Sequence, residues 1–308
     1  MHSTKFMKYV VTGGAGFVGN NIVKLLVDNG HEVIVVDNLH TGKMENLEDI
    51  QDQIEFYDED IRNVERMEKI LQNTDGVFHQ AALTIVQESF SKEQEYFDVN
   101  VRGTENIFKI AKKFRIKVIF ASSSSVYGNA KTIPIKEEFD KKPINPYGKT
   151  KLEDEFLAEK FWEDNSEIIG LRYFNIFGKG QTGSYAGVIT KFLENIKLKN
   201  QFKIFGDGTQ IRDFIHVKDI AKANLAIMES KTKDGFFNIG TGKATSIKDL
   251  AKIMIEISDH KQNIEYLQPL EGDVKESQAD TSLTKRIFDW EYSINLRDGL
   301  NELINQIR

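Results

Sequence analysis

A strand-like run that ends in three spaced glycines constrains the fold of this chain more than any other feature. The apolar segment Lys8–Thr12 is followed by Gly13, Gly16 and Gly19, and residues 20–29 then have helical periodicity. Glycines at this spacing allow a tight turn, a close backbone approach to a pyrophosphate, and close packing of the helix on the strand. The helix N-terminus adds a positive dipole that favours phosphates. The segment predicts a dinucleotide-binding turn, although three glycines alone also occur in ordinary turns.

Short β-branched runs alternate with longer amphipathic segments, which is typical of helices wound around a parallel sheet. The expected strands are residues 8–12, 33–36, 54–57, 76–79, 117–120, 168–172 and 236–239. The expected helices of the second half are residues 188–198, 220–229, 246–258 and 296–307. The pattern predicts an α/β protein with a doubly wound parallel sheet (Rossmann) and a smaller C-terminal substrate-binding lobe. We expect the dinucleotide-binding domain over 1–177 and the lobe over 178–308, with segments near 214–240 packing back onto the first domain.

Composition excludes several classes of protein. A net charge of −6 argues against nucleic acid as the main partner. The absence of cysteine excludes disulfides, thiolate catalysis and thiolate metal sites, and the six histidines lack ligand spacing, so no metal is expected. No segment approaches the roughly 20 apolar residues of a membrane span. The first residues form no apolar signal segment, so we expect a cytoplasmic protein that does not bind membranes.

Two carboxylates follow the strands beside the glycine turn. Asp37 ends the second strand, about 20 residues beyond the glycines. There its carboxylate can accept hydrogen bonds from both hydroxyls of the adenosine ribose. A 2′-phosphate there would meet like charge, so the sequence predicts NAD rather than NADP. Asp60 follows the third strand and is placed to reach the adenine amino group, although its position alone fits a solvated loop acid nearly as well.

A tyrosine and a lysine supply the predicted chemistry. Asn145 and Pro146 indicate a helix start, which places Tyr147 and Lys151 at i and i+4 on one face. A free phenol has a pKa of about 10 and is a weak base, but a nearby ammonium and a nicotinamide ring favour the phenolate. Alone, such a pair is typical of a helix surface. Together with the glycine turn and Asp37, it predicts hydride transfer involving an alcohol.

A run of four serines, residues 122–125, follows the expected strand over 117–120. Ligands of doubly wound sheets bind beyond the carboxyl ends of the strands, so we expect these hydroxyls to face the substrate. A polar turn without a ligand is the alternative.

These motifs together resemble the extended short-chain dehydrogenase/reductase family, and within it the nucleotide-sugar epimerases. The resemblance covers essentially the whole chain through segments 12–19, 37–38, 60–62, 79–82, 100–104, 122–128, 147–151, 172–178, 206–208, 212–217 and 272–274. It implies an enzyme that inverts C4 of a UDP-hexose with NAD through a transient 4-keto sugar.

The resemblance also implies roles for individual residues. Counting back four from Tyr127 places the catalytic serine at Ser123, with Tyr147 as base and Lys151 as the residue that tunes it. The implied cofactor contacts are Gly13, Gly16, Phe17, Val18, Gly19, Asp37, Asn38, Asp60, Ile61, Gln80, Ala81, Ala82, Asn100, Tyr147 and Lys151. The implied substrate contacts are Thr84, Ser123, Ser124, Asn175, Val188, Arg212, Asp273 and Ser277.

Subfamily features favour epimerisation. Sugar 4,6-dehydratases carry two acidic residues directly after the catalytic serine or threonine, and nucleotide-sugar decarboxylases usually carry a glutamate at the second of these positions. This chain has Ser124 and Ser125 there. Ser277 falls where 4-epimerases place a gatekeeper, and a serine leaves room for an N-acetyl group. We therefore expect UDP-GlcNAc/UDP-GalNAc to enter as well as UDP-glucose/UDP-galactose. Leu270 stands where the family often has an arginine that binds the diphosphate of the substrate. Lys275 is a candidate to bind the diphosphate in its place.

Alternatives remain open at this point. The run 121–128 is also common in UDP-glucuronate 4-epimerases, so a substrate carboxylate at C6 is one alternative. Another nucleotide-sugar epimerase or a reductase is a second, and a non-catalytic NAD-binding sensor is a distant third. Amphipathic segments 95–114 and 147–162 resemble the helices that pair in this family, which implies a homodimer through a four-helix bundle.

Overall fold

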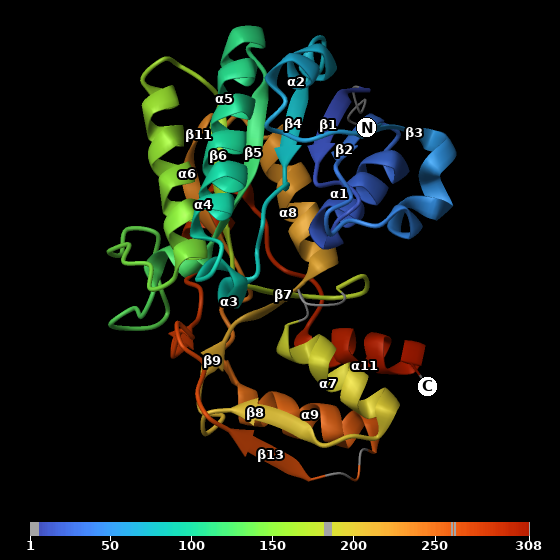
Figure 1. Cartoon of the computed structure of the whole chain (residues 1–308), viewed down its shortest axis with the longest axis vertical. Coiled ribbons are helices and arrows are strands. Elements are labelled where there is room, and N and C mark those ends of the chain that lie inside the picture. Colours follow the sequence, from blue (N-terminus) through green and yellow to red (C-terminus); the bar gives the residue numbers. More distant parts are fainter. Residues whose placement is uncertain (1–5, 182–186, 260, 262, 308) are drawn as a thin grey trace.

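The computed structural model describes residues 6–181, 187–259, 261 and 263–307. Its centre is a seven-stranded sheet in the order β11-β6-β5-β4-β1-β2-β3, with every neighbouring pair parallel (Figure 1). The strands are β1 Lys8–Thr12, β2 Glu32–Asp37, β3 Ile54–Asp58, β4 Gly76–His79, β5 Lys117–Ser123, β6 Ile168–Tyr173 and β11 Asp234–Ile239. The central strands are apolar runs because both of their faces are covered. This is why the sequence marked the central strands clearly, and the two edge strands β3 and β11 were predicted as well.

Helices cover both faces of this sheet, which confirms the predicted doubly wound class. On one face α1 (Phe17–Asp28) packs with α8 (Val217–Glu229) over an apolar core. On the other face α2 (Val64–Leu71), α5 (Gly103–Phe114) and α6 (Pro146–Trp162) enclose a second core. Shorter helical pieces connect these elements: η1 Met44–Gln53, α3 Val86–Ser89, α4 Glu93–Tyr96, η2 Phe97–Arg102 and η3 Ser124–Tyr127.

The remaining elements form a second lobe beyond the carboxyl ends of the strands, coloured yellow to red in Figure 1. An apolar cluster joins α7 Val188–Leu198, α9 Ile247–Ser258 and α11 Leu296–Ile307 with β8 Phe202–Phe205, which pairs with β13 Ile264–Leu267. Two small sheets lie between the lobe and the main sheet. They contain β7 Asn175–Phe177, β10 Phe214–His216, β9 Ile211–Arg212, β12 Thr245–Ser246 and β14 Glu276–Ser277. α10 (Ser282–Phe288) returns to pack on β11.

Three differences from the sequence prediction bear on the site. α1 begins at Phe17 rather than Asn20, because the glycine turn leads directly into the helix with Gly16 as its N-cap. β5 continues through Ser123, so the first two serines belong to the strand. The helical segment expected over 95–114 contains a π-helical turn, η2, between α4 and α5.

None of the helices in the described part of the chain combines the length and apolar character needed to cross a membrane.

A buried lysine joins β5 to the end of α8. The Lys117 ammonium donates to the carbonyls of Ile227, Met228 and Ser230 at 2.9, 3.0 and 2.8 Å. The last carbonyls of a helix have no partner within the helix, and a cation there also complements the helix dipole. Lys117 therefore fixes the C-terminal end of α8 against the sheet.

We predict that Lys117→Met lowers the free energy of unfolding by about 2–4 kcal/mol, because buried carbonyls lose their donor. Urea denaturation of the full chain measures this change. Lys231→Met is the matched control, since Lys231 is exposed beyond the same end of α8 and its loss should leave stability unchanged. Equal stabilities of the two variants would contradict the capping role.

Candidate active site

The glycine turn after β1 is shaped by contacts that exclude larger residues. Gly13 has a φ of +67°, and a Cβ on it would lie 2.8 Å from the Ala81 nitrogen. A Cβ on Gly19 would lie 2.0 Å from the carbonyl oxygen of Gly13. α1 has no side-chain cap, so its first amides are available to an anion. The backbone amides of the turn and the N-terminus of α1 can therefore bind a pyrophosphate.

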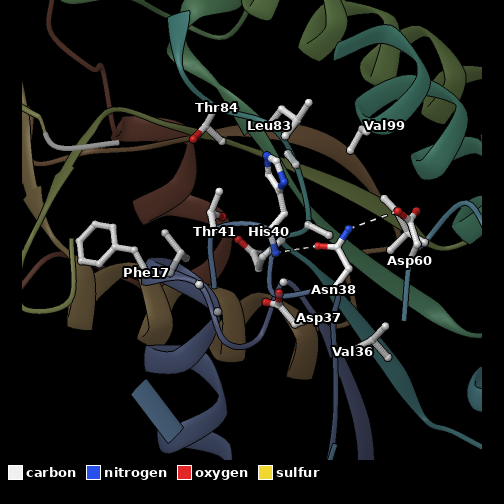
Figure 2. A pocket seen from close by; sticks show the side chains of 18 of the residues that line it. Phe17, Val36, Asp37, Asn38, His40, Thr41, Asp60, Leu83, Thr84 and Val99 are labelled. Atoms are coloured by element: carbon white, nitrogen blue, oxygen red, sulfur yellow. Dashed lines mark hydrogen bonds between the residues drawn. The ribbon is translucent and has the colours of Figure 1, made fainter. Parts of the chain in front are cut away.

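A cavity of about 240 Å³ opens beside this turn (Figure 2). Most of the residues expected to contact the cofactor line it: Gly13, Gly16, Phe17, Val18, Gly19, Asp37, Asn38, Asp60, Ile61, Gln80, Ala81 and Ala82. Other residues that line the cavity were not assigned to the cofactor site from the sequence, among them His40, Thr41, Asn46, Arg62 and Val99. They come from the turns after β2 and β3, from η1 and from η2, where no periodic pattern indicates which side chains face a cavity.

Asp37 lies at the end of β2 with its carboxylate turned toward the glycine turn. Its Oδ2 accepts from the Ala15 amide at 3.0 Å and its Oδ1 from the Leu39 amide at 2.9 Å. Burial raises the pKa of Asp37 above its usual value, and the backbone amides oppose this shift. The carboxylate thus fixes the turn that forms the cavity, and each oxygen retains a lone pair for a ribose hydroxyl.

Asp60 belongs to a hydrogen-bonded corner of the same cavity. The Arg62 side chain donates to both of its oxygens, at 2.9 and 2.7 Å, and the Asn38 amide donates to Oδ2 at 3.2 Å. Figure 2 shows the Asn38–Asp60 contact at the cavity edge. The hydrogen bond from Arg62 lowers the pKa of Asp60, so it is held as a carboxylate.

A second cavity of about 300 Å³ adjoins the first and shares residues with it. The shared residues are Phe17, Val18, Gln80, Ala82, Thr84 and Gln181. The residues expected to be catalytic, Ser123, Tyr147 and Lys151, all line the second cavity. Expected substrate contacts that line it are Thr84, Asn175 and Val188. The structure therefore brings together residues that lie far apart in the sequence.

The start of α6 places the tyrosine and the lysine. The Asn145 side chain accepts from the Gly148 amide at 2.8 Å, and Pro146 occupies the first turn, as the sequence predicted. Tyr147 follows in that turn and Lys151 lies one turn later. The Lys151 ammonium is buried and donates to Asp154 Oδ2 at 3.1 Å. Sequence reasoning did not identify Asp154, because one acidic residue within a helix gives no sign of its burial.

Asn100 supports both cavities without lining either one. Its side-chain amide donates to the Leu83 carbonyl and to the Thr150 hydroxyl, both at 3.0 Å, and its Oδ1 accepts from the Leu83 amide at 2.8 Å. It sits in the π-helical turn η2, where one extra residue in the turn redirects side chains. Asn100 thus links the loop after β4 to the helix that carries Tyr147.

The serines of 122–125 do not all face the substrate region as expected. Ser122 lines the second cavity, but its hydroxyl donates to Glu155 Oε1 at 2.6 Å. The Ser123 hydroxyl accepts from the Ser125 amide at 3.1 Å and remains at the cavity wall. Ser124 lies in η3 and lines neither cavity. The strand continues further than predicted, so neighbouring serines alternate in direction.

The other expected substrate residues are Arg212 in β9, Ser277 in β14 and Asp273 in the loop before β14. Arg212 pairs with Asp273 at 2.5 Å, and Ser277 is buried in β14 beside Arg212 in β9. None of the three lines either cavity. The loop around Gly272 nevertheless touches the start of α6, since the Asn145 amide donates to the Gly272 carbonyl at 3.4 Å. Leu270 in this loop is exposed.

His79 lies buried beneath the site and makes two hydrogen bonds. Its ring nitrogens bond the hydroxyls of Thr12 and Thr104 at 2.7 and 2.9 Å. Burial, with a smaller effect of Lys151, lowers the pKa of His79 to about 3. The ring is therefore neutral, and both of its nitrogens are hydrogen-bonded.

Comparison with known proteins agrees with this geometry. The family model described as "NAD dependent epimerase/dehydratase family" matches residues 9–240. A UDP-glucose 4-epimerase structure from Thermotoga maritima, solved with UDP-glucose, is 36% identical with a TM-score of 0.93, and covers 97% of this chain and 98% of that chain.

Two further structures are similar over nearly the same length. A UDP-N-acetylglucosamine 4-epimerase from Methanobrevibacter ruminantium, in complex with UDP-N-acetylmuramic acid, is 37% identical with a TM-score of 0.93 and 98% coverage of both chains. A UDP-glucuronic acid 4-epimerase from Bacillus cereus, in complex with UDP-glucuronic acid and NAD, is 30% identical with a TM-score of 0.90. It covers 98% of this chain and 100% of that chain.

We predict that Asp37→Asn weakens NAD binding by about 10- to 100-fold, because an amide replaces one acceptor oxygen and the charge is lost. Calorimetric titration of NAD into protein freed of cofactor measures the affinity. Asp58→Asn is the control, since Asp58 pairs with Asp37 at the same end of the neighbouring strand but is exposed. Unchanged NAD affinity in Asp37→Asn would remove Asp37 from the cofactor site.

Proposed function

This chain belongs to the NAD-dependent epimerase/dehydratase family, and from that premise we propose that it inverts C4 of a UDP-hexose through a transient 4-keto sugar. One observation carries the proposal. The cavity lined by Ser123, Tyr147 and Lys151 adjoins the cavity beside the glycine turn, and the two share wall residues. A cofactor in the first cavity and an alcohol in the second would therefore meet.

The residues of the first cavity fit NAD. Gly13 and Gly19 allow the close backbone approach that a pyrophosphate needs, and Asp37 offers acceptors to a ribose without a 2′-phosphate. Lys151 and Asn100 would support the nicotinamide end. When bound, NAD supplies a reversible hydride exchange at the sugar C4.

The proton transfers fall to the chain's own residues. Tyr147 takes the proton of the sugar O4 hydroxyl as C4 loses its hydride, and the C–O bond becomes a carbonyl. The Lys151 ammonium favours the phenolate that this step requires, and the Ser123 hydroxyl donates a hydrogen bond to the same oxygen. The keto sugar then rotates in the cavity, so that hydride returns to the opposite face of C4. Tyr147 returns the proton to O4. Electrons and protons balance over the cycle, so NAD is not consumed.

The proposed substrates are UDP-glucose/UDP-galactose, with UDP-GlcNAc/UDP-GalNAc accepted as well. The small side chain of Ser277 supports the second pair, although it lies in β14 and lines neither cavity. The relatives include 4-epimerases of glucose, N-acetylglucosamine and glucuronic acid type. UDP-glucuronate is therefore the second candidate, favoured by the sequence of residues 121–128.

Proton NMR of the anomeric signals tests the proposal. Protein with bound NAD is incubated separately with UDP-glucose, UDP-GlcNAc and UDP-glucuronate. We predict that the galacto epimers of the first two appear without net formation of NADH, and that Tyr147→Phe lowers the rate about 10²- to 10⁴-fold. Tyr266→Phe is the control, because Tyr266 is exposed on β13 in the second lobe.

The outcomes separate the candidates. Turnover of UDP-glucuronate alone would select the second candidate, and net consumption of NADH would indicate a reductase. No change in any sugar with NAD bound would contradict the UDP-sugar assignment. Turnover of UDP-glucose but not UDP-GlcNAc would remove the gatekeeper role from Ser277.

We also propose a homodimer in which α5 and α6 of two copies form a four-helix bundle. These helices lie side by side on the outer face of the main domain (Figure 1). Large apolar side chains are exposed along this side, with Phe97 in η2 38% and Phe156 in α6 43% exposed. Exposed phenylalanines of this kind mark a candidate association surface.

We predict that Phe156→Glu weakens dimerisation about 100-fold or more, because each dimer loses two buried rings and gains two desolvated charges. Sedimentation velocity over a range of protein concentrations measures the effect. Ile287→Glu is the matched control, since Ile287 on α10 is 43% exposed as well. Equal sedimentation of wild type and Phe156→Glu would exclude this face as the interface.

A further inference from the structure

The lysine of the active site is held by a carboxylate from its own helix. Asp154 lies three residues after Lys151 in α6, and its Oδ2 accepts from the ammonium at 3.1 Å. Both side chains are enclosed, with 4% of the lysine and 0% of the aspartate exposed. A buried pair of this kind interacts far more strongly than a pair on a helix surface.

Lys151 is the only cation that pairs with Asp154 among the described residues. The neighbouring Glu155 is occupied by Arg172, which donates to both of its oxygens at 2.8 Å. His79, which lies below on β4, is neutral because burial lowers its pKa to about 3. In the described part of the chain, no other charged group pairs with the carboxylate.

The environment of Asp154 opposes its ionisation. Its second oxygen, Oδ1, is buried and has no hydrogen-bond partner of normal geometry in the described part of the chain. Burial raises the pKa of Asp154 to about 7 and Glu155 raises it further, against the attraction and hydrogen bond of Lys151 and a hydrogen bond from the Thr104 side chain. Asp154 is therefore placed to change its charge near neutral pH, directly beside the ammonium that faces the second cavity.

We propose that Asp154 is a positioning residue that holds the Lys151 ammonium and limits how strongly this ammonium favours the phenolate of Tyr147. The proposal rests on the roles of Tyr147 and Lys151 in the proposed function. When Asp154 is ionised, its negative charge offsets part of the positive field at the phenol, and the phenol keeps its proton to higher pH. When Asp154 is neutral, the full charge of Lys151 acts on the phenol.

The size of the effect follows from helix geometry. Tyr147 and Asp154 are seven residues apart, about 10 Å along the helix axis. At this separation in a partly buried site, one unit charge changes the ionisation of a second group by about one pH unit. Such a shift is large enough to move the pH range in which the phenolate is populated.

The Asp154→Asn variant removes the negative charge of residue 154 but keeps the hydrogen bond that positions Lys151. The asparagine oxygen can still accept from Lys151, so the ammonium stays in place while the opposing charge is removed. We expect the midpoint of Tyr147 ionisation to fall by about one pH unit in this variant. Asp154→Ala removes the anchor as well, and we expect its kcat to fall in addition. Glu153→Gln is the matched control, because it removes the same charge from the adjacent, exposed residue of α6.

The readout is the ultraviolet absorbance of phenolate in the holoenzyme with NAD bound, recorded against pH. Subtracting the curve of the matching Tyr147→Phe protein isolates the Tyr147 phenol. Buried tyrosines contribute little in this range, since burial raises the pKa of Tyr9 to about 12 and those of Tyr127 and Tyr173 well above the usual value. The titration needs no substrate, so it remains valid if the UDP-sugar assignment fails.

A downward shift in Asp154→Asn, together with no shift in Glu153→Gln, would support the proposal. An unchanged or higher midpoint in Asp154→Asn would overturn it and leave Asp154 as a packing residue. Should the variants not fold, the wild-type curve decides alone. Coupling to Asp154 predicts a curve broader than a single one-proton ionisation, and a one-proton curve counts against the proposal. The absence of any Tyr147 phenolate signal would instead contradict the proposed function.

Discussion

The buried ion pair between Arg172 and Glu155 holds the active-site helix on the sheet, and the rest of the site depends on it. The guanidinium binds both oxygens of Glu155 at 2.8 Å, and both side chains are 1% exposed. It also donates to the Tyr127 hydroxyl at 2.7 Å and to the Glu137 carbonyl at 2.9 Å. Such a pair offsets its desolvation only when its hydrogen bonds are satisfied, and removing one partner leaves a buried charge. Its directional contacts fix where α6 lies.

α6 then presents successive residues to different surroundings. Tyr147 and Lys151 line the second cavity, whereas Glu155 binds Arg172, which lies in β6. Asp154 stands between these environments, in contact with the lysine. A rotation of the helix that improved one of these contacts would break the others. The orientation of the proposed base is therefore set by buried electrostatics below it rather than by contacts within the open cavity.

The sequence predicted the local elements better than the contacts between distant segments. Apolar strands, glycines that exclude a Cβ and a capped helix start leave local patterns, so β1 and β4 were located with their bounds and α6 with its cap Asn145. The extension of β5 into the serines, the π-helical turn at Asn100 and the burial of Asp154 depend on residues distant in sequence. No local pattern encodes them. The same holds for Arg212, whose partner Asp273 is supplied by a loop about 60 residues further on.

The carboxylate of Asp213 is one of several links between the second lobe and the main domain. Asp213, which lies between β9 and β10, accepts from the amides of Thr241, Gly242 and Ala279 at 2.8, 2.8 and 3.1 Å. It thereby joins the segment that follows β11 to the segment between β14 and α10. The Gly272 loop reaches the start of α6 through Asn145. In the proposed reaction, a nucleotide held near the segments that Asp213 fixes would stay in place while the sugar turns beside Tyr147, because both regions are held on the same sheet.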